Sequence, residues 1–325
     1  MNKMLLKTTL ISSFLFTGIL FANDSIIVKN DNLYPEGISY NAKDKIFFVS
    51  SVAKGEVWSV DVNGNKHLFA KDKRIVSSIG LLVDNKNNRL LVCVGDPDAG
   101  SKSSDKTKGK LAALAIFDLD SKKEMAYYDL ASLDKGHGHL ANDVTVDNKG
   151  NIYVTDSFSP NIYKINAHGK AMIWVHQDLW QVQPGQFGLN GIVYHPSGFI
   201  IVAHYQTKSL YKININNPGN IKKIKIVNNI LNTIDGMLLL NNRTLLVVSN
   251  NLSGANEGNG VYKLTSKDNW NTSKQIASMK TDASFPTTLT KAHGNIYLMH
   301  SQLLELFSGN KNPKEYFEIQ HVSFK

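Results

Sequence analysis

Four side chains with hard oxygen donors stand at the same point of a repeated pattern in this 325-residue chain. Each is followed by glycine or aspartate and then by an apolar residue, and the four are Glu36, Asn142, Asn190 and Asp235. Carboxylates and amide oxygens suit hard divalent cations, and two negative charges would match such a cation. If the four converge, they predict a site for one divalent ion per chain, with calcium as the expected occupant. The same residue types also cap turns, which is the structural alternative.

The repeated pattern occurs six times, as a strand, a polar turn ending in glycine, and a second strand. The clearest copies are residues 141–156 and 189–204, each continuing into a third strand at 161–166 and 209–214. Equivalent positions are 43, 63, 48, 45 and 51 residues apart and are occupied by Glu36, Ile79, Asn142, Asn190, Asp235 and Pro286. Strand-rich units of this length are typical of β-propellers. We therefore expect an all-β, six-bladed β-propeller of four-stranded antiparallel blades, with these positions in a ring around the axis.

The ends of the repeat set the domain boundaries. Residues 23–325 are expected to form the single propeller domain, closed by a strand from residues 24–30 that joins the last blade. The second copy contains an insertion at residues 95–110, rich in Ser, Lys, Asp and Gly, which is expected to be a mobile loop.

A second set of polar residues follows the turn glycines by six positions, namely Asp156, His204 and His300, with Ser249 at the equivalent place in the fifth copy. A histidine beside a metal-bound water would suit a general base, because its pKa lies near neutrality. The alternative is that these residues bond the backbone of a neighbouring blade. His137 and His139 precede Asn142 in a glycine-rich segment and are expected at the pocket mouth.

The segments 35–37, 142–143, 189–191 and 234–237, in this order and spacing, resemble the gluconolactonase and regucalcin family of six-bladed propellers. The resemblance implies that Glu36, Asn190 and Asp235 bind one metal ion directly and that Asn142 contacts metal or substrate. Sugar-lactone members of the family have an arginine two residues before that asparagine. Here the position is Leu140, so we expect small, uncharged or weakly charged lactones in place of sugar acids.

The resulting hypothesis is a calcium-dependent lactonase or related ester hydrolase acting on a small molecule. Asp235 or Asp143 is the first candidate for the base that draws a proton from water, followed by His204 and His139; Asn142 and His300 are candidates for contacting the substrate. The competing hypothesis is a non-catalytic exported propeller that binds a partner or a cell-envelope ligand.

The composition limits the class of protein. The chain is 42% hydrophobic and 19% charged, which excludes a disordered or multi-spanning protein.

The first residues predict the cellular location. Residues 1–22 have a basic start, a short apolar run and a small final residue, and predict a signal peptide for periplasmic or secreted export, with an uncleaved anchor as the alternative. Cys93, the only cysteine, excludes an internal disulfide. The net charge of +9 comes mainly from dispersed lysines, so we expect no nucleic-acid partner, no membrane span after signal removal, and a monomer.

Overall fold

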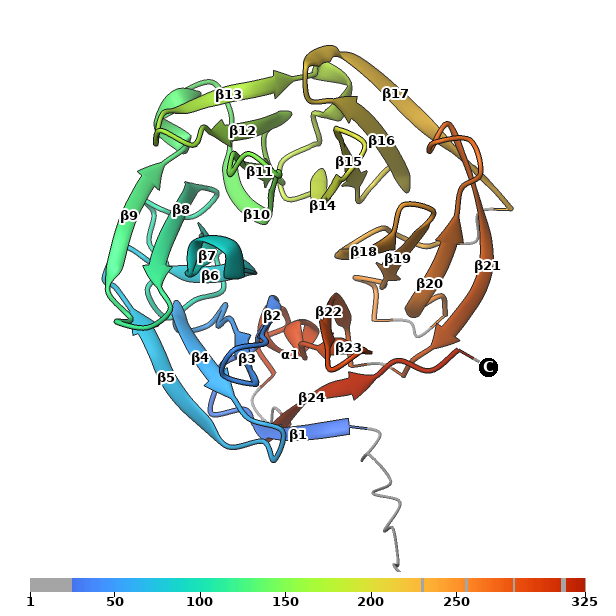
Figure 1. Cartoon of the computed structure of the whole chain (residues 1–325). Coiled ribbons are helices and arrows are strands. Elements are labelled where there is room, and N and C mark those ends of the chain that lie inside the picture. Colours follow the sequence, from blue (N-terminus) through green and yellow to red (C-terminus); the bar gives the residue numbers. More distant parts are fainter. Residues whose placement is uncertain (1–24, 229–230, 255–256, 283, 311–313, 325) are drawn as a thin grey trace, which may run out of the picture.

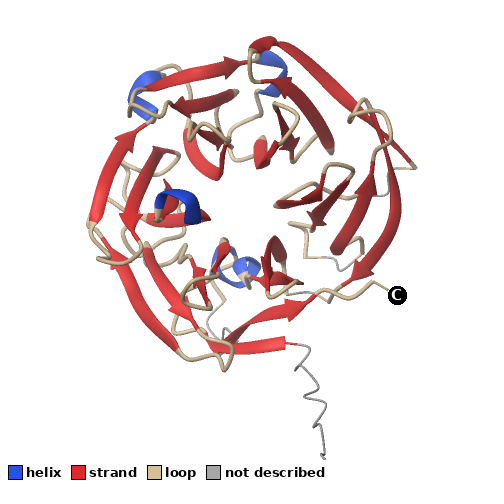
Figure 2. Ribbon diagram, viewed as in Figure 1, coloured by secondary structure: helices blue, strands red, loops and turns tan. Residues whose placement is uncertain are grey.

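The computed structural model describes residues 25–228, 231–254, 257–282, 284–310 and 314–324. The predicted signal peptide, residues 1–22, lies outside the described residues. The regular secondary structure of the described residues is almost entirely β-strand, with one short α-helix, α1 (Leu303–Phe307), and three 3₁₀ turns, Asn85–Asn87, Ala131–Leu133 and Asp178–Trp180. Figure 2 shows these few helical turns between the strands. Within these ranges no helix is long and apolar enough to cross a membrane.

The strands follow one another as antiparallel meanders. The first three meanders are β2 (Ile38–Asn41), β3 (Ile46–Val49), β4 (Glu56–Val60) and β5 (Lys66–Lys71); β6 (Ser77–Asp84), β7 (Arg89–Gly95), β8 (Lys110–Asp118) and β9 (Glu124–Asp129); and β10 (His139–Val146), β11 (Ile152–Asp156), β12 (Asn161–Ile165) and β13 (Ala171–His176). The later ones are β14 (Leu189–His195), β15 (Phe199–His204), β16 (Ser209–Asn214) and β17 (Asn217–Val227); β18 (Met237–Asn241), β19 (Thr244–Ser249), β20 (Gly260–Thr265) and β21 (Thr272–Lys280); and β22 (Pro286–Ala292), β23 (Asn295–His300) and β24 (Tyr316–His321).

The chain start completes the last meander. Strand β1 (Ser25–Lys29) pairs antiparallel with β24, with Ser25 opposite Gln320 and Lys29 opposite Tyr316. The predicted closure of the ring by this strand is therefore confirmed. In Figure 1 the meanders surround a central opening, with β2, β6, β10, β14, β18 and β22 innermost. The all-β, propeller-like architecture expected from the repeat is what the structure shows.

Apolar strand faces pack between neighbouring meanders and form the core. One cluster joins Phe48 and Phe69 of the first meander to Leu90 and Val92 of the second. Another joins Ile201 and its neighbours in β15 to strands β18–β20. A meander buries both of its faces only if another meander packs against each of them. In a closed ring every meander has two such neighbours.

Glycines bring the innermost strands close together. A Cβ on Gly191 would lie 2.4 Å from the carbonyl oxygen of Asp235, and one on Gly37 would lie 2.3 Å from the carbonyl oxygen of Ile79. These contacts leave no room for a side chain. The glycine after the ring position therefore lets the next innermost strand approach.

The insertion at residues 95–110, which was expected to be a mobile loop, makes several hydrogen bonds. The buried carboxylate of Asp96 accepts hydrogen bonds from Ser103 Oγ (2.9 Å) and Thr107 Oγ1 (2.7 Å), and Lys102 Nζ donates to the carbonyl of Ile75 (2.9 Å). The polar side chains on which the expectation of mobility rested form hydrogen bonds within the loop. It is a bonded loop, and its residue Pro97 reaches the cavity described next.

Candidate functional site

A cavity of about 50 Å³ lies at the starts of the innermost strands. Its polar lining contains the four predicted oxygen donors, Glu36, Asn142, Asn190 and Asp235, all of them buried. The structure therefore brings together residues that are up to 199 positions apart in the sequence. Its remaining wall is largely apolar and includes Val52, Ile79, Pro97, Leu140, Phe187, Leu252, Phe285, Leu303 and Phe307.

The sixth ring position needs a correction. Thr287 lines the cavity, where Pro286 was expected. Pro286 pairs with His300 across the hairpin, as Ala141 pairs with Asp156, so Thr287 is the residue equivalent to Asn142. Thr287 Oγ1 donates a hydrogen bond to the carbonyl of Glu36 (2.7 Å), which links the last meander to the first at the ring.

Three oxygens in this cavity have no hydrogen-bond partner. Glu36 Oε2, Asn142 Oδ1 and Asn190 Oδ1 are buried and unpaired. Buried polar atoms are almost always paired, because an unsatisfied one costs about 1–3 kcal/mol. Together with the Asp235 carboxylate, these oxygens fit the donor set of a hard divalent cation. The described residues contain no cluster of three or more His, Cys, Asp or Glu side chains arranged for a metal, and two donors of this set are amides.

The cavity brings acidic side chains together away from water. Burial raises the pKa of Glu36 well above its usual range, and the nearby charges of Asp235 and Asp143 raise it further. Burial also raises the pKa of Asp235 to about 7, although hydrogen bonds from Asn250 and Asn190 oppose the shift. A cation among these acids would favour their charged forms.

Asn250 is a site residue that the repeat did not indicate. Its Nδ2 donates to Asp235 Oδ2 (2.5 Å) and to the carbonyl of Pro286 (2.8 Å), and its Oδ1 accepts the hydroxyl of Tyr205 (2.6 Å). Asn250 is fully buried, so these bonds fix one oxygen of the Asp235 carboxylate. It stands one position beyond Ser249, and asparagine is too common in this chain to single it out.

Asp143 faces a different space from its neighbour Asn142. Its carboxylate accepts hydrogen bonds from the backbone N–H groups of Val144 (2.8 Å) and Ile192 (3.2 Å). It borders a second cavity of about 240 Å³ among the innermost strands. Burial raises the pKa of Asp143 to about 6. It is close enough to Glu36 to affect its charge, but it does not line the cavity that holds the four donors.

Neither His204 nor His300 lines the donor cavity. His204 bonds the carbonyl of Trp180 through Nε2 (3.2 Å) and accepts the N–H of Thr207 at Nδ1 (3.3 Å). His300 contacts Ser284 Oγ and Gln320 Oε1. Both are buried within the protein interior. Both anchor local structure, and this corrects their expected position at the cavity rim. His204 bonds the backbone, as in the alternative considered for it, whereas the partners of His300 are side chains.

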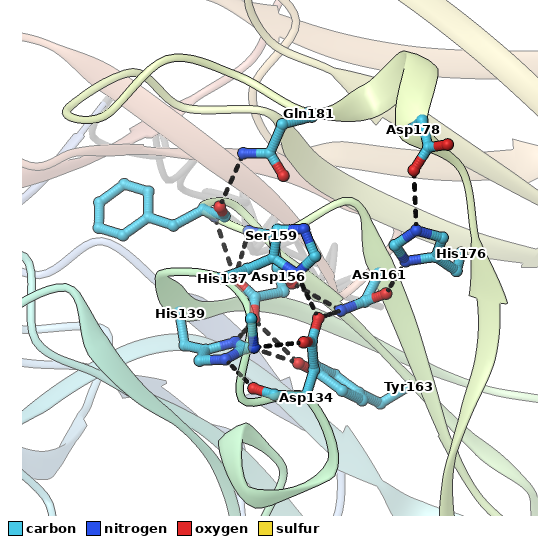
Figure 3. A network of polar contacts seen from close by, with 12 residues as sticks. Asp134, His137, His139, Asp156, Ser159, Asn161, Tyr163, His176, Asp178 and Gln181 are labelled. Carbon is cyan, nitrogen blue, oxygen red and sulfur yellow. Dashed lines mark hydrogen bonds and ion pairs between the residues drawn. The ribbon is translucent and has the colours of Figure 1, made fainter.

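His139 is also buried away from the cavity mouth, in the polar network of Figure 3. Its Nδ1 lies 2.8 Å from Asp156 Oδ2, and its Nε2 lies 2.6 Å from the carbonyl of Asp134. Burial lowers the pKa of His139, but the bond to Asp156 and the charge of that carboxylate outweigh it, so the pKa is raised. Asp156 Oδ1 also accepts the N–H of Leu140 (2.8 Å). The network thus holds the start of β10, the strand that carries Asn142.

His137 belongs to the outer part of the same network. It is partly exposed, and its Nδ1 lies 2.7 Å from Asp134 Oδ2. Figure 3 shows His137 beside Asp134, with His176 and Asp178 beyond Asn161. It does not line the donor cavity either.

The fold resembles several solved propellers. The allergen Mala s 1 of Malassezia sympodialis superposes with a TM-score of 0.73 at 17% identity, covering 93% of this chain and 96% of that chain. A gluconolactonase from Xanthomonas campestris gives a TM-score of 0.60 at 12% identity (93% and 91% covered), and a luciferin-regenerating enzyme 0.61 at 11% (93% and 97% covered). No family model matches the sequence, and no curated protein matches it significantly. The predicted resemblance to gluconolactonase-type propellers is confirmed as a likeness of fold.

Proposed function

We propose that this protein is an exported, calcium-dependent hydrolase of the lactonase type, which opens a small lactone or ester with water. The observation that supports this most directly is the group of three unpaired buried oxygens, Glu36 Oε2, Asn142 Oδ1 and Asn190 Oδ1, beside the Asp235 carboxylate. The presence of gluconolactonase among proteins of similar fold supports the choice of reaction.

Glu36, Asn142, Asn190 and Asp235 would hold the ion, one per chain. A divalent cation bound there would polarise the substrate carbonyl and stabilise negative charge on its oxygen. Asp235 is the candidate base inside the cavity, since it lines the cavity and Asn250 fixes its Oδ2. Asp143 is the second candidate, and it would act from the side of the second cavity.

The apolar wall supports a neutral substrate. Leu140 is almost completely buried and lines the cavity where sugar-lactone members of the resembled family have an arginine. An aliphatic side chain cannot donate hydrogen bonds to a carboxylate or a polyol. We therefore propose small, uncharged or weakly charged lactones as the substrate class.

We further propose six blades in one domain from residue 23, in an exported monomer. The second cavity supports the blade count, because its lining comes from β2, β6, β10, β14, β18 and β22 in turn. The signal-like residues 1–22 support export.

A second candidate is a non-catalytic binding propeller. It is favoured by the position of His139, His204 and His300, none of which lines the donor cavity to serve as a base. Both candidate functions are compatible with the metal site, and they differ in whether the protein converts a substrate.

The test is a panel of neutral lactones, aldonolactones and aryl esters, assayed with chelator-treated protein before and after calcium is restored. We expect turnover of neutral lactones that depends on calcium. Calcium binding without turnover of any substrate would favour the binding propeller. Turnover that survives complete metal removal would contradict the metal-dependent mechanism.

A further inference from the structure

The positive charge of the chain is unevenly distributed along the sequence. Residues 205–280 contain nine lysines and one arginine but only three acids, Asp235, Glu257 and Asp268. One of these acids, Asp235, is buried in the donor cavity. Most of the net charge of +9 therefore lies on two successive meanders.

Strands β17 and β21 bring part of this charge onto one face. They pair in parallel, with Lys225 opposite Thr272 and Val227 opposite Lys274. Paired residues of parallel strands point to the same side of the sheet, and so do alternate residues of each strand. The resulting β17–β21 face consists of Lys223, Lys225, Val227, Thr272 and Lys274, all exposed. Ile276, also exposed, follows Lys274 by two residues at a bulge of β21. In Figure 1 both strands lie on the outer rim of the ring.

Aliphatic side chains stand among the lysines of this face. The exposed fraction is 38% for Val227 and 54% for Ile276. The nearby acid, Asp268, accepts hydrogen bonds from the N–H (2.9 Å) and the hydroxyl (2.8 Å) of Thr272, and a further one from Ser266. The face thus combines cationic and apolar groups, with its neighbouring carboxylate engaged by local donors.

A hollow of about 390 Å³ adjoins the face. It is lined by Thr207, Lys208, Ser209, Lys223, Ile224, Lys225 and Ile226. Lys223 and Lys225 of the face border this hollow, and lysine ammonium groups are suited to a phosphate group.

We propose that the β17–β21 face docks on an anionic phospholipid bilayer. Lysines attract the negative surface of such a bilayer, the hollow accepts a lipid phosphate, and Val227 and Ile276 enter the interfacial region. The face contains no arginine and no aromatic residue, so it lacks the groups that nucleic-acid sites use to hold guanine or to stack on bases. This inference is independent of any hydrolytic activity.

The test is co-sedimentation of the full chain with vesicles of phosphatidylcholine alone or mixed with phosphatidylglycerol, at low and high salt. We expect binding only to the mixed vesicles and weakening at high salt. The variant K223E/K225E/K274E should lose at least about tenfold in partitioning, because each lysine at an anionic surface contributes about 1 kcal/mol. The matched control K123E/K149E/K170E has the same net charge and should lose much less.

Three outcomes would overturn the proposal: equal binding to both vesicle types, equal losses in the two triple variants, or tighter binding to double-stranded DNA than to the mixed vesicles. If K223E/K225E/K274E does not fold, the single variant K225E and the salt dependence of the parent protein replace it. Unchanged binding of K225E to the mixed vesicles, or no weakening of parent binding at high salt, would overturn the proposal. A second variant, V227S/I276S, should weaken binding to the mixed vesicles at high salt, where the apolar contribution dominates.

Discussion

Buried carboxylates need partners, and the partners of Asp156 and Asp235 differ in kind. Asp156 accepts hydrogen bonds from the N–H of Leu140 and the hydroxyl of Tyr163, and it pairs with His139. Asp235 is held by Asn250 at one oxygen and faces a cavity with unpaired oxygens. Asp156 is therefore satisfied within the fold, whereas the environment of Asp235 favours a bound cation.

The pair of His139 and Asp156 gives a prediction for stability against pH. Because the pKa of His139 is raised in the folded protein, its charged form stabilises the fold fully below its unfolded pKa of about 6.5, and this contribution is lost as the pH rises through the folded value. Asp156→Asn should cost about 3 kcal/mol of unfolding free energy near pH 6 and less at alkaline pH. Urea unfolding of parent and variant across this range measures the difference.

The control is Asp178→Asn in the same network. The Asp178 side chain is almost fully exposed, so its contact with His176 should contribute little at any pH. A cost for Asp156→Asn that does not change with pH would contradict a charged His139.

Leu140 gives a prediction for specificity. Leu140→Arg should shift the ratio of turnover between aldonolactones and neutral lactones about tenfold towards the aldonolactones, because a guanidinium can donate charge-assisted hydrogen bonds to the substrate. Leu140→Met, which keeps the volume and polarity of the wall, should leave the ratio as in the parent. An unchanged ratio in a folded Leu140→Arg protein would show that this position does not select the substrate.

At the scale of the elements, the contact of each innermost strand with the next determines the geometry of the ring. Gly191→Ala should destabilise the protein by about 1–3 kcal/mol and weaken calcium binding, because the new Cβ would meet the backbone carbonyl of Asp235 at 2.4 Å. Gly219→Ala is the control, since its Cβ would have no neighbour closer than Asn217 Oδ1 at 3.7 Å. Thermal unfolding and calcium titration of both variants measure the two effects. Equal stability of the two variants would contradict the close approach.

The repeat predicted much of this arrangement because its strands and turn glycines have a regular period. That period located Glu36, Asn142, Asn190 and Asp235 at one ring, and it located Asp156, His204 and His300 at equivalent places in their hairpins. The period of the repeat does not determine whether a side chain at the end of a strand points into the cavity or into the protein interior. This is why the histidines were expected at the rim, although they bond neighbouring segments.

Two other differences have local causes. The sixth ring residue is Thr287, where Pro286 was expected, since hairpin pairing fixes the register and the sequence around this position has no glycine to mark it. Asn250 reaches Asp235 across a hairpin, so only the folded structure reveals their contact.

At the scale of the whole molecule, β1 joins the two ends of the chain. Its pairing with β24 closes the ring and requires the segment from Ser25 to remain after any processing. Cleavage after Ala22 would satisfy this requirement. Mass spectrometry of the exported protein should therefore find an amino terminus at or near Asn23. Recovery of only the full-length chain from the cytosol would contradict export.

The claim on which the account depends is that the ring of four oxygens binds one divalent cation. Calorimetric titration of calcium into chelator-treated protein tests it most directly. We expect one site per chain in the parent and in Asp105→Asn/Glu315→Gln, a control that removes two exposed charges. We expect no binding in Glu36→Gln/Asp235→Asn, which removes both charges from the site and leaves the side chains nearly the same size. Equal calcium affinity in the parent and Glu36→Gln/Asp235→Asn would contradict the metal site and the hydrolytic mechanism that depends on it.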